Sequence, residues 1–439
     1  MIVPPPGTTS VAMTITDTPP AGVTLLSFEV SVTGATLNPG GVDLLGGRGP
    51  IRIEVKQLET ESAFLNAANV APGTYTSINL SFANPELTFK NGTGAALAGC
   101  AAGAVCEIKP AGTLSSMVTF PGSGIVIAAN SPTGIQLDVN PNTILSPALG
   151  VDFSLAGAVS AQQLAMKQAG ELDDLDELKG AVQNLDVTNK KFTLHTVAGD
   201  FPITTDTNTE FEFEACAKND FSCLQNNQVI EVDVKIMAGG IFLARKIEFE
   251  DDAEDDELEG IVFGVDDAMH FRMVVLDELR SVNNVTVGNP VVVTLSNPSF
   301  QVKAESLTVP SGLQGAFEGA TDTSQLLTGQ TVQIRLTAPA SVGPPVAVTA
   351  NRVRLRMTQF TASVSGAPAP PNFNVGSLPA LFTNAAITSI HVQTSSKTVF
   401  QGIMDISGLA DGNLVSLRGL LFNNGTNAPE LIAKKVRKR

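Results

Sequence analysis

The chain has 439 residues, of which 43% are hydrophobic and 16% are charged, and it carries a net charge of −16. Its length predicts roughly two to four domains, and its apolar content excludes wholesale disorder. Trp is absent, Tyr occurs once and His three times, which is a poor supply of side chains for acid–base catalysis.

The N-terminal third predicts an extended leader followed by a β-sandwich. Residues 1–9 are proline-rich and uncharged. This start is typical of a spacer behind a removed signal peptide or a lipid-anchored cysteine, so we interpret the chain as a mature form. Residues 10–158 contain short runs rich in β-branched residues, with turn signals about every ten residues. A helix is expected only near residues 60–69.

Two acidic segments predict linkers. Residues 159–177 begin with a helical composition and end with five acids between Glu171 and Leu178. Residues 250–257 belong to a run of nine acids in the twelve residues from Glu248 to Glu259. Clustered carboxylates can bind calcium, but neither run has the spacing of a calcium-binding loop. We therefore interpret both segments as solvated linkers.

Three related segments follow the first linker and predict small antiparallel β-barrels, at residues 178–249, 258–355 and 356–439. Their opening phrases are Leu178-Lys-Gly-Ala-Val182, Leu258-Glu-Gly-Ile-Val262 and, less clearly, Phe360-Thr-Ala-Ser-Val364. A later turn-and-strand phrase places Asn227, Gly329 and Gly412 at one shared position, where we expect a positive φ. Each segment closes on an alanine followed by basic residues, at Ala244, Ala350 and Ala433. The predicted fold is all-β, a sandwich followed by about three barrel-like repeats.

The four cysteines form two local pairs. Cys100 and Cys106 enclose five residues, and Cys216 and Cys223 enclose six. Neither pair has a redox or zinc spacing, so we predict two disulfides and an oxidising compartment, with buried free thiols as the alternative. Tyr75 follows a Pro-Gly turn, where a buried ring and a bonded hydroxyl would form a structural corner.

Parts of the chain resemble two uncharacterised bacterial families. Residues 10–155, with Thr16-Asp-Thr-Pro19 and Pro72-Gly-Thr-Tyr75, resemble an envelope lipoprotein domain of unknown function. Residues 178–439, with the opening and closing phrases above, resemble a family of small repeated β domains. The resemblance implies a secreted or cell-surface bacterial protein, and it implies no catalytic residues.

The charge is unevenly distributed along the chain. Ten basic and three acidic residues follow residue 349, so the last 90 residues carry +7 and the first 349 carry −23. This asymmetry predicts attraction between the tail of one copy and the body of another. A basic edge strand that prevents unwanted pairing is the alternative.

These observations predict a non-catalytic surface protein in which four β modules form a rod and copies assemble head-to-tail. The β-rich N-terminal segment would add to a neighbouring chain as a strand. The expected assembly residues are Val11, Met13, Ile15, Lys434, Lys435, Arg437, Lys438 and Arg439. The alternative is a monomeric, lipid-anchored module that binds a cell-surface polysaccharide or another extracellular ligand, although Trp and Tyr platforms for sugars are scarce.

Catalytic and ligand motifs do not emerge from the sequence. It has no nucleophile elbow, phosphate-binding loop or zinc-protease motif, and His195, His270 and His391 are far apart. We predict no catalytic residues, metal site or cofactor. We expect no nucleic-acid partner, because the chain as a whole would repel a polyanion. No stretch reaches the roughly 18 uninterrupted apolar residues of a membrane helix.

Overall fold

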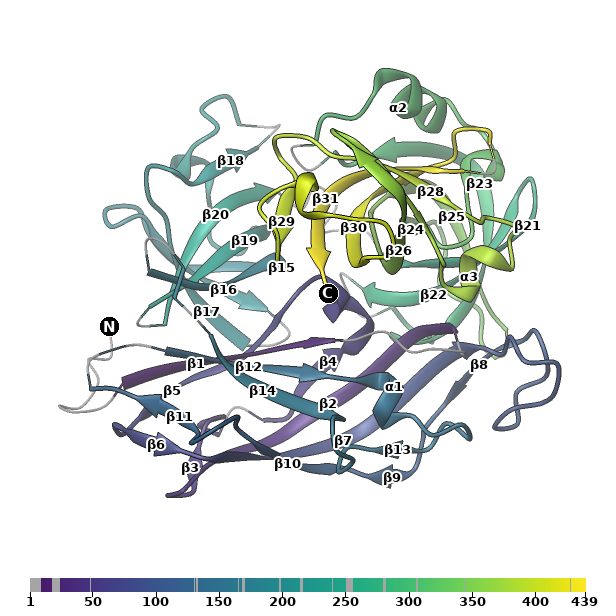
Figure 1. Cartoon of the computed structure of the whole chain (residues 1–439). Helices are drawn as coiled ribbons and strands as arrows, with labels where there is room; N and C mark the ends of the chain where they lie inside the picture. Colours follow the sequence, from purple (N-terminus) through teal and green to yellow (C-terminus); the bar gives the residue numbers. More distant parts are fainter. Residues whose placement is uncertain are drawn as a thin grey trace.

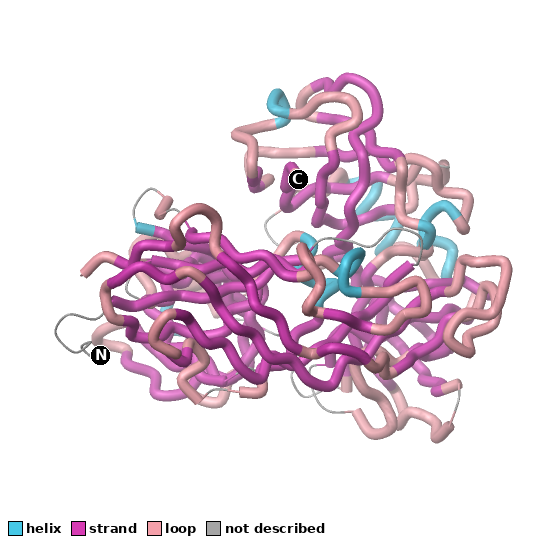
Figure 2. The backbone as a smooth tube through the Cα atoms, turned by 60° about the horizontal axis from the view of Figure 1, so that its bottom comes forward, coloured by secondary structure: helices cyan, strands magenta, loops and turns pink. Residues whose placement is uncertain are grey.

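The computed structural model describes residues 9–17, 24–47, 49–129, 131, 133–164, 166–167, 170–196, 199–213, 216–238, 240–249, 256–278, 282–304, 307–343, 345–426 and 428–439. Strands form most of the regular structure, and Figure 2 shows only a few short helices among them. The predicted all-β fold, a sandwich followed by three small barrel-like repeats, is confirmed. Within these ranges, every helix is too short or too polar to span a membrane.

Two sheets form the sandwich. The first has the strand order β14 (Val159–Leu164), β12 (Thr133–Val139), β1 (Thr9–Asp17) and β5 (Ala63–Val70). The second has the order β10 (Ser115–Thr119), β7 (Ser77–Lys90), β2 (Thr24–Asn38) and β3 (Val42–Asp43), with β4 (Ile51–Glu54) on β2 and β8 (Val105–Ile108) on β7. Side chains of both sheets form one apolar core, because alternate residues of each strand face inward.

Short elements complete the sandwich. Two small strand pairs join β6 (Gly73–Tyr75) to β11 (Ile125–Ile127) and β9 (Gly112–Thr113) to β13 (Val151–Asp152). Two single turns of helix, η1 (Val55–Glu59) and α1 (Pro141–Ile144), lie between strands. The helix predicted near residues 60–69 is wrong, because most of that segment is β5, which pairs with β1.

The three barrels share one strand order. Barrel 1 contains β15 (Glu171–Asp186), β16 (Lys191–Thr196), β17 (Gly199–Thr204), β18 (Glu210–Glu212), β19 (Val229–Met237) and β20 (Ile241–Phe249). Barrel 2 contains β21 (Glu257–Asp267), β22 (His270–Glu278), β23 (Pro290–Val302), β24 (Thr331–Leu336) and β25 (Val346–Leu355). Barrel 3 contains β26 (Met357–Ala369), β27 (Asn372–Gly376), β28 (Ile390–Gln393), β29 (Val399–Gln401), β30 (Leu414–Phe422) and β31 (Glu430–Lys438). In each barrel the third strand pairs in parallel with the closing strand, through β17–β20, β23–β25 and β28–β31.

The predicted phrases occupy equivalent places in the three barrels. Asn227, Gly329 and Gly412 have φ values of 68°, 99° and 78°, as expected for their turn. Their amides donate to the carbonyls of Val182, Val262 and Val364 at 2.7, 2.7 and 2.9 Å. The less certain third opening phrase is therefore correct, and Ala362 stands where the other two barrels have glycine.

A further repeated phrase, Asp-x-Ser-x-Leu, precedes these turns and was missed in the sequence analysis. Asp220, Asp322 and Asp405 each accept a hydrogen bond from the amide of the serine two residues later, at 2.8, 2.9 and 2.8 Å. Each aspartate caps a single turn of 3₁₀ helix, η3 (Phe221–Cys223), η4 (Thr323–Gln325) or η5 (Ile406–Gly408). Two longer helices, α2 (Ser311–Glu318) and α3 (Ala380–Thr383), are specific to barrels 2 and 3.

The first predicted linker is largely strand rather than linker. Residues 159–164 are β14 of the sandwich, and the acidic segment from Glu171 onward is the first strand of barrel 1. Two β-bulges in β15 let Leu172 and Leu175 both enter the barrel core, where they are 2% and 1% exposed. Most of the second predicted linker, residues 250–255, lies outside the described residues.

The barrels pack against the sandwich and against one another, so the four modules do not form the predicted rod. In Figure 1 the sandwich forms the lower layer, with barrel 1 above one end and barrels 2 and 3 above the other. Phe64 of the sandwich inserts into the core of barrel 1, with ring centroids 4.9 Å from Phe242. Thr88 donates to the carbonyl of Gly288 in barrel 2 at 2.6 Å. Thr361 of barrel 3 donates to Glu59 at 3.2 Å.

Candidate functional site: a charged pocket where three modules meet

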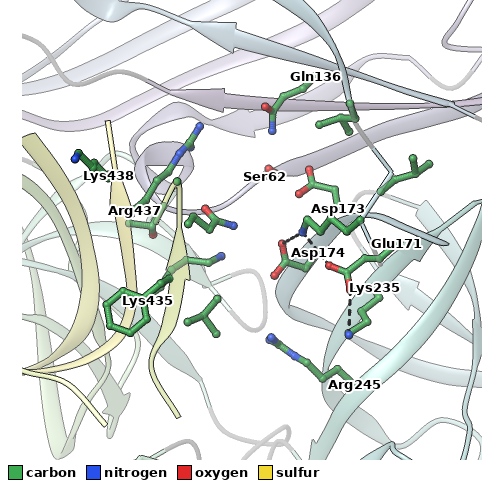
Figure 3. Close-up of a pocket in the computed structure, with 18 residues that line it drawn as sticks. Ser62, Gln136, Glu171, Asp173, Asp174, Lys235, Arg245, Lys435, Arg437 and Lys438 are labelled. Atoms are coloured by element: carbon green, nitrogen blue, oxygen red, sulfur yellow. Dashed lines mark hydrogen bonds and ion pairs between the residues drawn. The ribbon is translucent and has the colours of Figure 1, made fainter. Parts of the chain in front are cut away.

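A pocket of about 660 Å³ lies where the sandwich, barrel 1 and barrel 3 meet (Figure 3). The sandwich contributes Ser62 and Gln136 to its wall, and Lys167 lies in the segment that leads into barrel 1. Barrel 1 contributes the start of β15, with Lys235 and Arg245 from the neighbouring strands. Barrel 3 contributes β29 and the end of β31, including Arg437 and Lys438. The lining is strongly polar, with cations and carboxylates on different elements.

The start of β15 supplies the acidic wall of the pocket. Lys167 Nζ contacts Glu171 at 2.8 Å and Asp174 at 3.7 Å, and Lys235 Nζ contacts the other oxygen of Glu171 at 3.0 Å. Asp173 is 6% exposed, and its Oδ2 atom is buried without a hydrogen-bond partner among the described residues. Burial and the neighbouring Asp174 raise the pKa of the Asp173 carboxyl.

A buried ionic cluster continues behind this wall. Lys435 Nζ lies 3.2 Å from both Glu61 of the sandwich and Asp176 of barrel 1, and Arg245 contacts Asp176 at 2.5 Å. Arg418 approaches the same two carboxyls at 3.5 and 3.8 Å. The cluster therefore joins three modules, and the side chains of Arg418, Lys435 and Asp176 at its centre are almost fully removed from water.

The surroundings of the two carboxyls of this cluster shift their pKa values in opposite directions. Burial and the adjacent Asp176 carboxylate raise the pKa of Glu61 to about 8. Burial also opposes ionisation of Asp176, but Lys435, Arg245 and Arg418 hold the pKa of Asp176 well below its usual range. The raised pKa of Glu61 favours its protonated form, which can donate a hydrogen bond to the Asp176 carboxylate.

A second ionic cluster joins barrels 1 and 2. Arg356, with a side chain only 1% exposed, contacts Glu259 at 3.0 Å and Glu231 at 3.2 Å. Lys303 contacts Glu231 at 3.4 Å and Glu248 at 2.7 Å. Burial opposes the charge of Glu231, but Lys303 and Arg356 hold its pKa well below the usual range. These acids and bases neutralise one another within the chain.

The structure gathers the predicted tail residues at one end of β31. Lys434 lies 3.8 Å from Asp233, Lys435 belongs to the buried cluster, and Lys438 Nζ donates to the carbonyl of Gly408 at 3.0 Å. Arg439 donates to the carbonyl of Glu59 at 2.6 Å. Arg437 lines the pocket. The excess positive charge of the tail thus meets acidic segments of its own chain, and its predicted contact with a second copy stays a prediction.

The predicted N-terminal assembly residues lie elsewhere, in β1. Val11, Met13 and Ile15 pair with β12 on one side, and β5 flanks the strand on the other. Met13 is 1% exposed in the sandwich core, whereas the side chains of Val11 and Ile15 lie outside the described part. The structure does not join β1 and the basic tail into one site.

The structural predictions for cysteine and tyrosine agree with the geometry. Cys100 is bonded to Cys106, and Cys216 to Cys223, so the predicted disulfides are confirmed. Tyr75 is 6% exposed, and its hydroxyl donates to the carbonyl of Ala71 at 2.9 Å, as a structural corner requires.

The histidines and the carboxylates make no shared centre. His195 contacts Asp200 at 2.6 Å, His270 contacts Asp267 at 2.8 Å, and His391 contacts Glu430 at 3.6 Å, each within its own barrel. In the part of the chain that is described, no group of three or more His, Cys, Asp or Glu side chains has a geometry that could hold a metal ion.

The pocket residues Asp173, Gln136 and Arg437 were not identified together from the sequence. The signal for Asp173 was the spacing of Leu172, Leu175 and Leu178 through the acidic run, which indicates a buried face rather than a solvated linker. Gln136 carried no signal, because the pocket forms only when modules far apart in the sequence come together.

Comparisons with known proteins identify one region of the chain. Residues 179–248, most of barrel 1, match the family described as a domain of unknown function, DUF5666. No curated protein matches the chain. A solved multidomain protein of Streptococcus pneumoniae with nucleic acid binding domains is 9% identical over 59% of this chain and 72% of its own, with a TM-score of 0.11. The chain therefore contains a region similar to DUF5666.

Proposed function

We propose that the chain is a non-catalytic structural protein of the cell exterior that assembles with copies of itself by exchange of β1. The observation that carries this proposal is the position of β1, an interior strand of the first sandwich sheet. An interior strand that comes first in the chain order of the sandwich can be supplied by a neighbouring copy, since identical elements exchange at little cost in contacts.

The pairing of β1 supports strand exchange. Seven consecutive residues from Val11 to Asp17 pair in parallel with β12, while residues from Thr9 to Ile15 pair with β5. The buried Met13 fills part of the core. A sandwich without this strand would expose two strand edges and an apolar slot, so it would require either its own β1 or that of another copy.

Two further observations support the location and the class. Two disulfides persist in oxidising compartments such as the cell exterior. The ionisable groups of the central cluster engage one another in ion pairs, which suits a structural role better than proton transfer to a substrate. This proposal does not require the basic tail for assembly, because Lys434 and Lys435 contact carboxylates of the same chain and Lys438 and Arg439 donate to its backbone carbonyls.

A disulfide trap tests the exchange. Ala12 of β1 pairs with Ala67 of β5, so the double variant Ala12→Cys/Ala67→Cys should form interchain disulfides in assembled material and give a ladder on non-reducing gels. The matched control, Ala181→Cys/His195→Cys, joins two paired strands inside barrel 1 and should give only intrachain bonds. Assembled material in which residues 12 and 67 are joined only within chains would contradict exchange.

Electron microscopy of the natively isolated protein tests assembly itself. We expect regular filaments or arrays, and a chain lacking residues 1–16 should remain as single particles with folded barrels. Polymerisation of the truncated chain would rule out donation of β1. Single particles of the full chain would instead favour the second candidate, a monomeric binding module, for which the charged pocket is the specific supporting observation.

A further inference from the structure

We propose that the pocket between the sandwich, barrel 1 and barrel 3 binds a carboxylated sugar, a hexuronate unit of an acidic saccharide. This inference does not depend on strand exchange. It rests on a cation on one side of the pocket that has no partner among the described residues, and on polar groups that line the other side. Figure 3 shows Arg437 and Lys438 on one side and Asp173 on the other.

Arg437 provides the site for a carboxylate. It is half-buried, and the described residues offer its guanidinium no hydrogen bond or ion pair. Its cationic neighbour in β31, Lys435, is already held by Glu61 and Asp176. A guanidinium binds a carboxylate through two parallel hydrogen bonds, and partial burial strengthens that pairing. The pocket therefore has an unfilled position for a planar anion.

Asp173 favours a ligand that carries hydroxyl groups. The Asp173 residue lines the pocket, and a carboxylate exposed to a ligand accepts hydrogen bonds from hydroxyl groups. Gln136 is a second polar group directed at the pocket in Figure 3. A ligand with one carboxylate and several hydroxyls satisfies both sides, as a hexuronate does.

The acidic wall disfavours other anions. Glu171, Asp173 and Asp174 line the same pocket, so this wall repels a phosphate or sulfate ion, which carries more negative charge than one carboxylate, more strongly than it repels a hexuronate. The volume of about 660 Å³ falls in the range of small-ligand sites and accommodates one or two sugar units. Phe400 of β29 adds an apolar surface to the lining, which suits the face of a sugar ring.

Isothermal titration calorimetry of the full chain with trigalacturonate tests this site. We expect saturable one-site binding, and at least tenfold weaker binding of the fully methyl-esterified trimer, whose carboxylates are neutral. Arg437→Gln should weaken trigalacturonate binding by roughly ten- to a hundredfold, the effect of losing a charge-assisted pair. The control Lys397→Gln, which changes a half-exposed lysine of the same barrel paired with Glu210, should bind like the unmodified chain.

Thermal unfolding of Arg437→Gln checks that a loss of binding is local. We expect an unchanged melting temperature, because the half-buried side chain makes no polar contact with the described residues. Equal affinity for the acid and its ester, no binding of either trimer at millimolar concentration, or unchanged binding by Arg437→Gln would each overturn the proposal. Displacement of trigalacturonate by an equal concentration of inorganic phosphate would also overturn it, because the site would then select charge alone.

Discussion

Glu54 places a carboxyl inside the sandwich, where burial disfavours its charge. Its carboxyl accepts hydrogen bonds from Ser27 Oγ and from the amides of Phe28 and Lys56, at 2.5, 2.8 and 2.9 Å, and it caps η1. Burial raises the pKa of Glu54 to about 7. The protonated carboxyl is thus favoured in the folded state, and ionisation opposes folding.

This raised pKa predicts that the sandwich loses stability with rising pH. The contribution of Glu54 is fully present below its unfolded pKa of 4.5 and is lost as pH rises through about 7. The isosteric Glu54→Gln keeps the hydrogen-bond acceptor and should remove up to about 3 kcal/mol of this loss. Calorimetric unfolding between pH 4 and 8 measures it, with the exposed Glu318→Gln as control. Parallel pH profiles for Glu54→Gln and the unmodified chain would refute the assignment.

A substitution of Lys435 tests how much the buried ionic cluster contributes to stability. Lys435→Met removes a cation that Glu61 and Asp176 share, and it leaves buried carboxyls with less compensation. We expect a loss of about 3–5 kcal/mol in the free energy of unfolding. Urea unfolding followed by circular dichroism measures this, since the chain has no Trp. Lys397→Met breaks a surface pair whose side chains are 50% and 57% exposed, and should cost less than about 1 kcal/mol. Similar losses in the two variants would contradict the role of burial.

At the scale of elements, the repeated turn can be compared between two barrels. Gly329 and Gly412 both have positive φ, but only one is crowded. A Cβ at Gly412 would meet no atom within 4 Å, whereas at Gly329 it would lie 2.2 Å from Phe382 of α3. The turn of barrel 3 is therefore uncrowded, whereas the equivalent turn of barrel 2 packs against α3 of barrel 3.

We predict unequal costs for alanine at these two positions. Gly412→Ala should lose roughly 1–2 kcal/mol through left-handed backbone strain alone. Gly329→Ala should lose roughly 1–3 kcal/mol more, because the ring of Phe382 must move. Differential scanning calorimetry of the two variants measures both effects. Equal shifts in melting temperature would show that the contact with α3 contributes nothing.

Sequence repetition made the three barrels predictable. The long acidic strand β15 could not be predicted in this way. The matching phrases around Gly180, Gly260 and Ala362 located three units, because each barrel needs the same turn and closure. β15 escaped detection, since its bulges replace the two-residue alternation of a regular strand by an apolar spacing of three. Its acids also resembled a solvated run until Lys167, Lys235 and Arg245 were placed beside them.

At the scale of the whole molecule, the sequence could not predict how the barrels pack. The tail charges were visible, but their partners in Glu61 and Asp176 lie more than 250 residues away along the chain. Because the basic and acidic segments are far apart in the sequence, we expected them to meet between two copies. The fold instead brings these charged groups together within one chain. The pocket depends on the same packing, so its residues could not be assembled from local motifs.

Barrels 2 and 3 also share an apolar core. Leu420, Phe422 and Ile432 of barrel 3 belong to the core cluster of barrel 2. The ring of Phe422 lies 6.4 Å from that of Phe317 in α2, and Phe422 is 1% exposed. Two modules that share a core lose it together, so these barrels should open as one cooperative unit.

Hydrogen exchange of Phe422→Ala tests this cooperativity. Truncating a buried phenylalanine costs about 3–5 kcal/mol, and the cavity would border both barrels. We expect faster amide exchange throughout β21–β31, while β15–β20 remain protected. The control Phe192→Ala, in the separate core of barrel 1, should accelerate exchange in β15–β20 and leave barrels 2 and 3 unchanged. Faster exchange confined to β26–β31 in Phe422→Ala would show that barrel 2 is stable without its neighbour, and the two barrels would then be independent folding units.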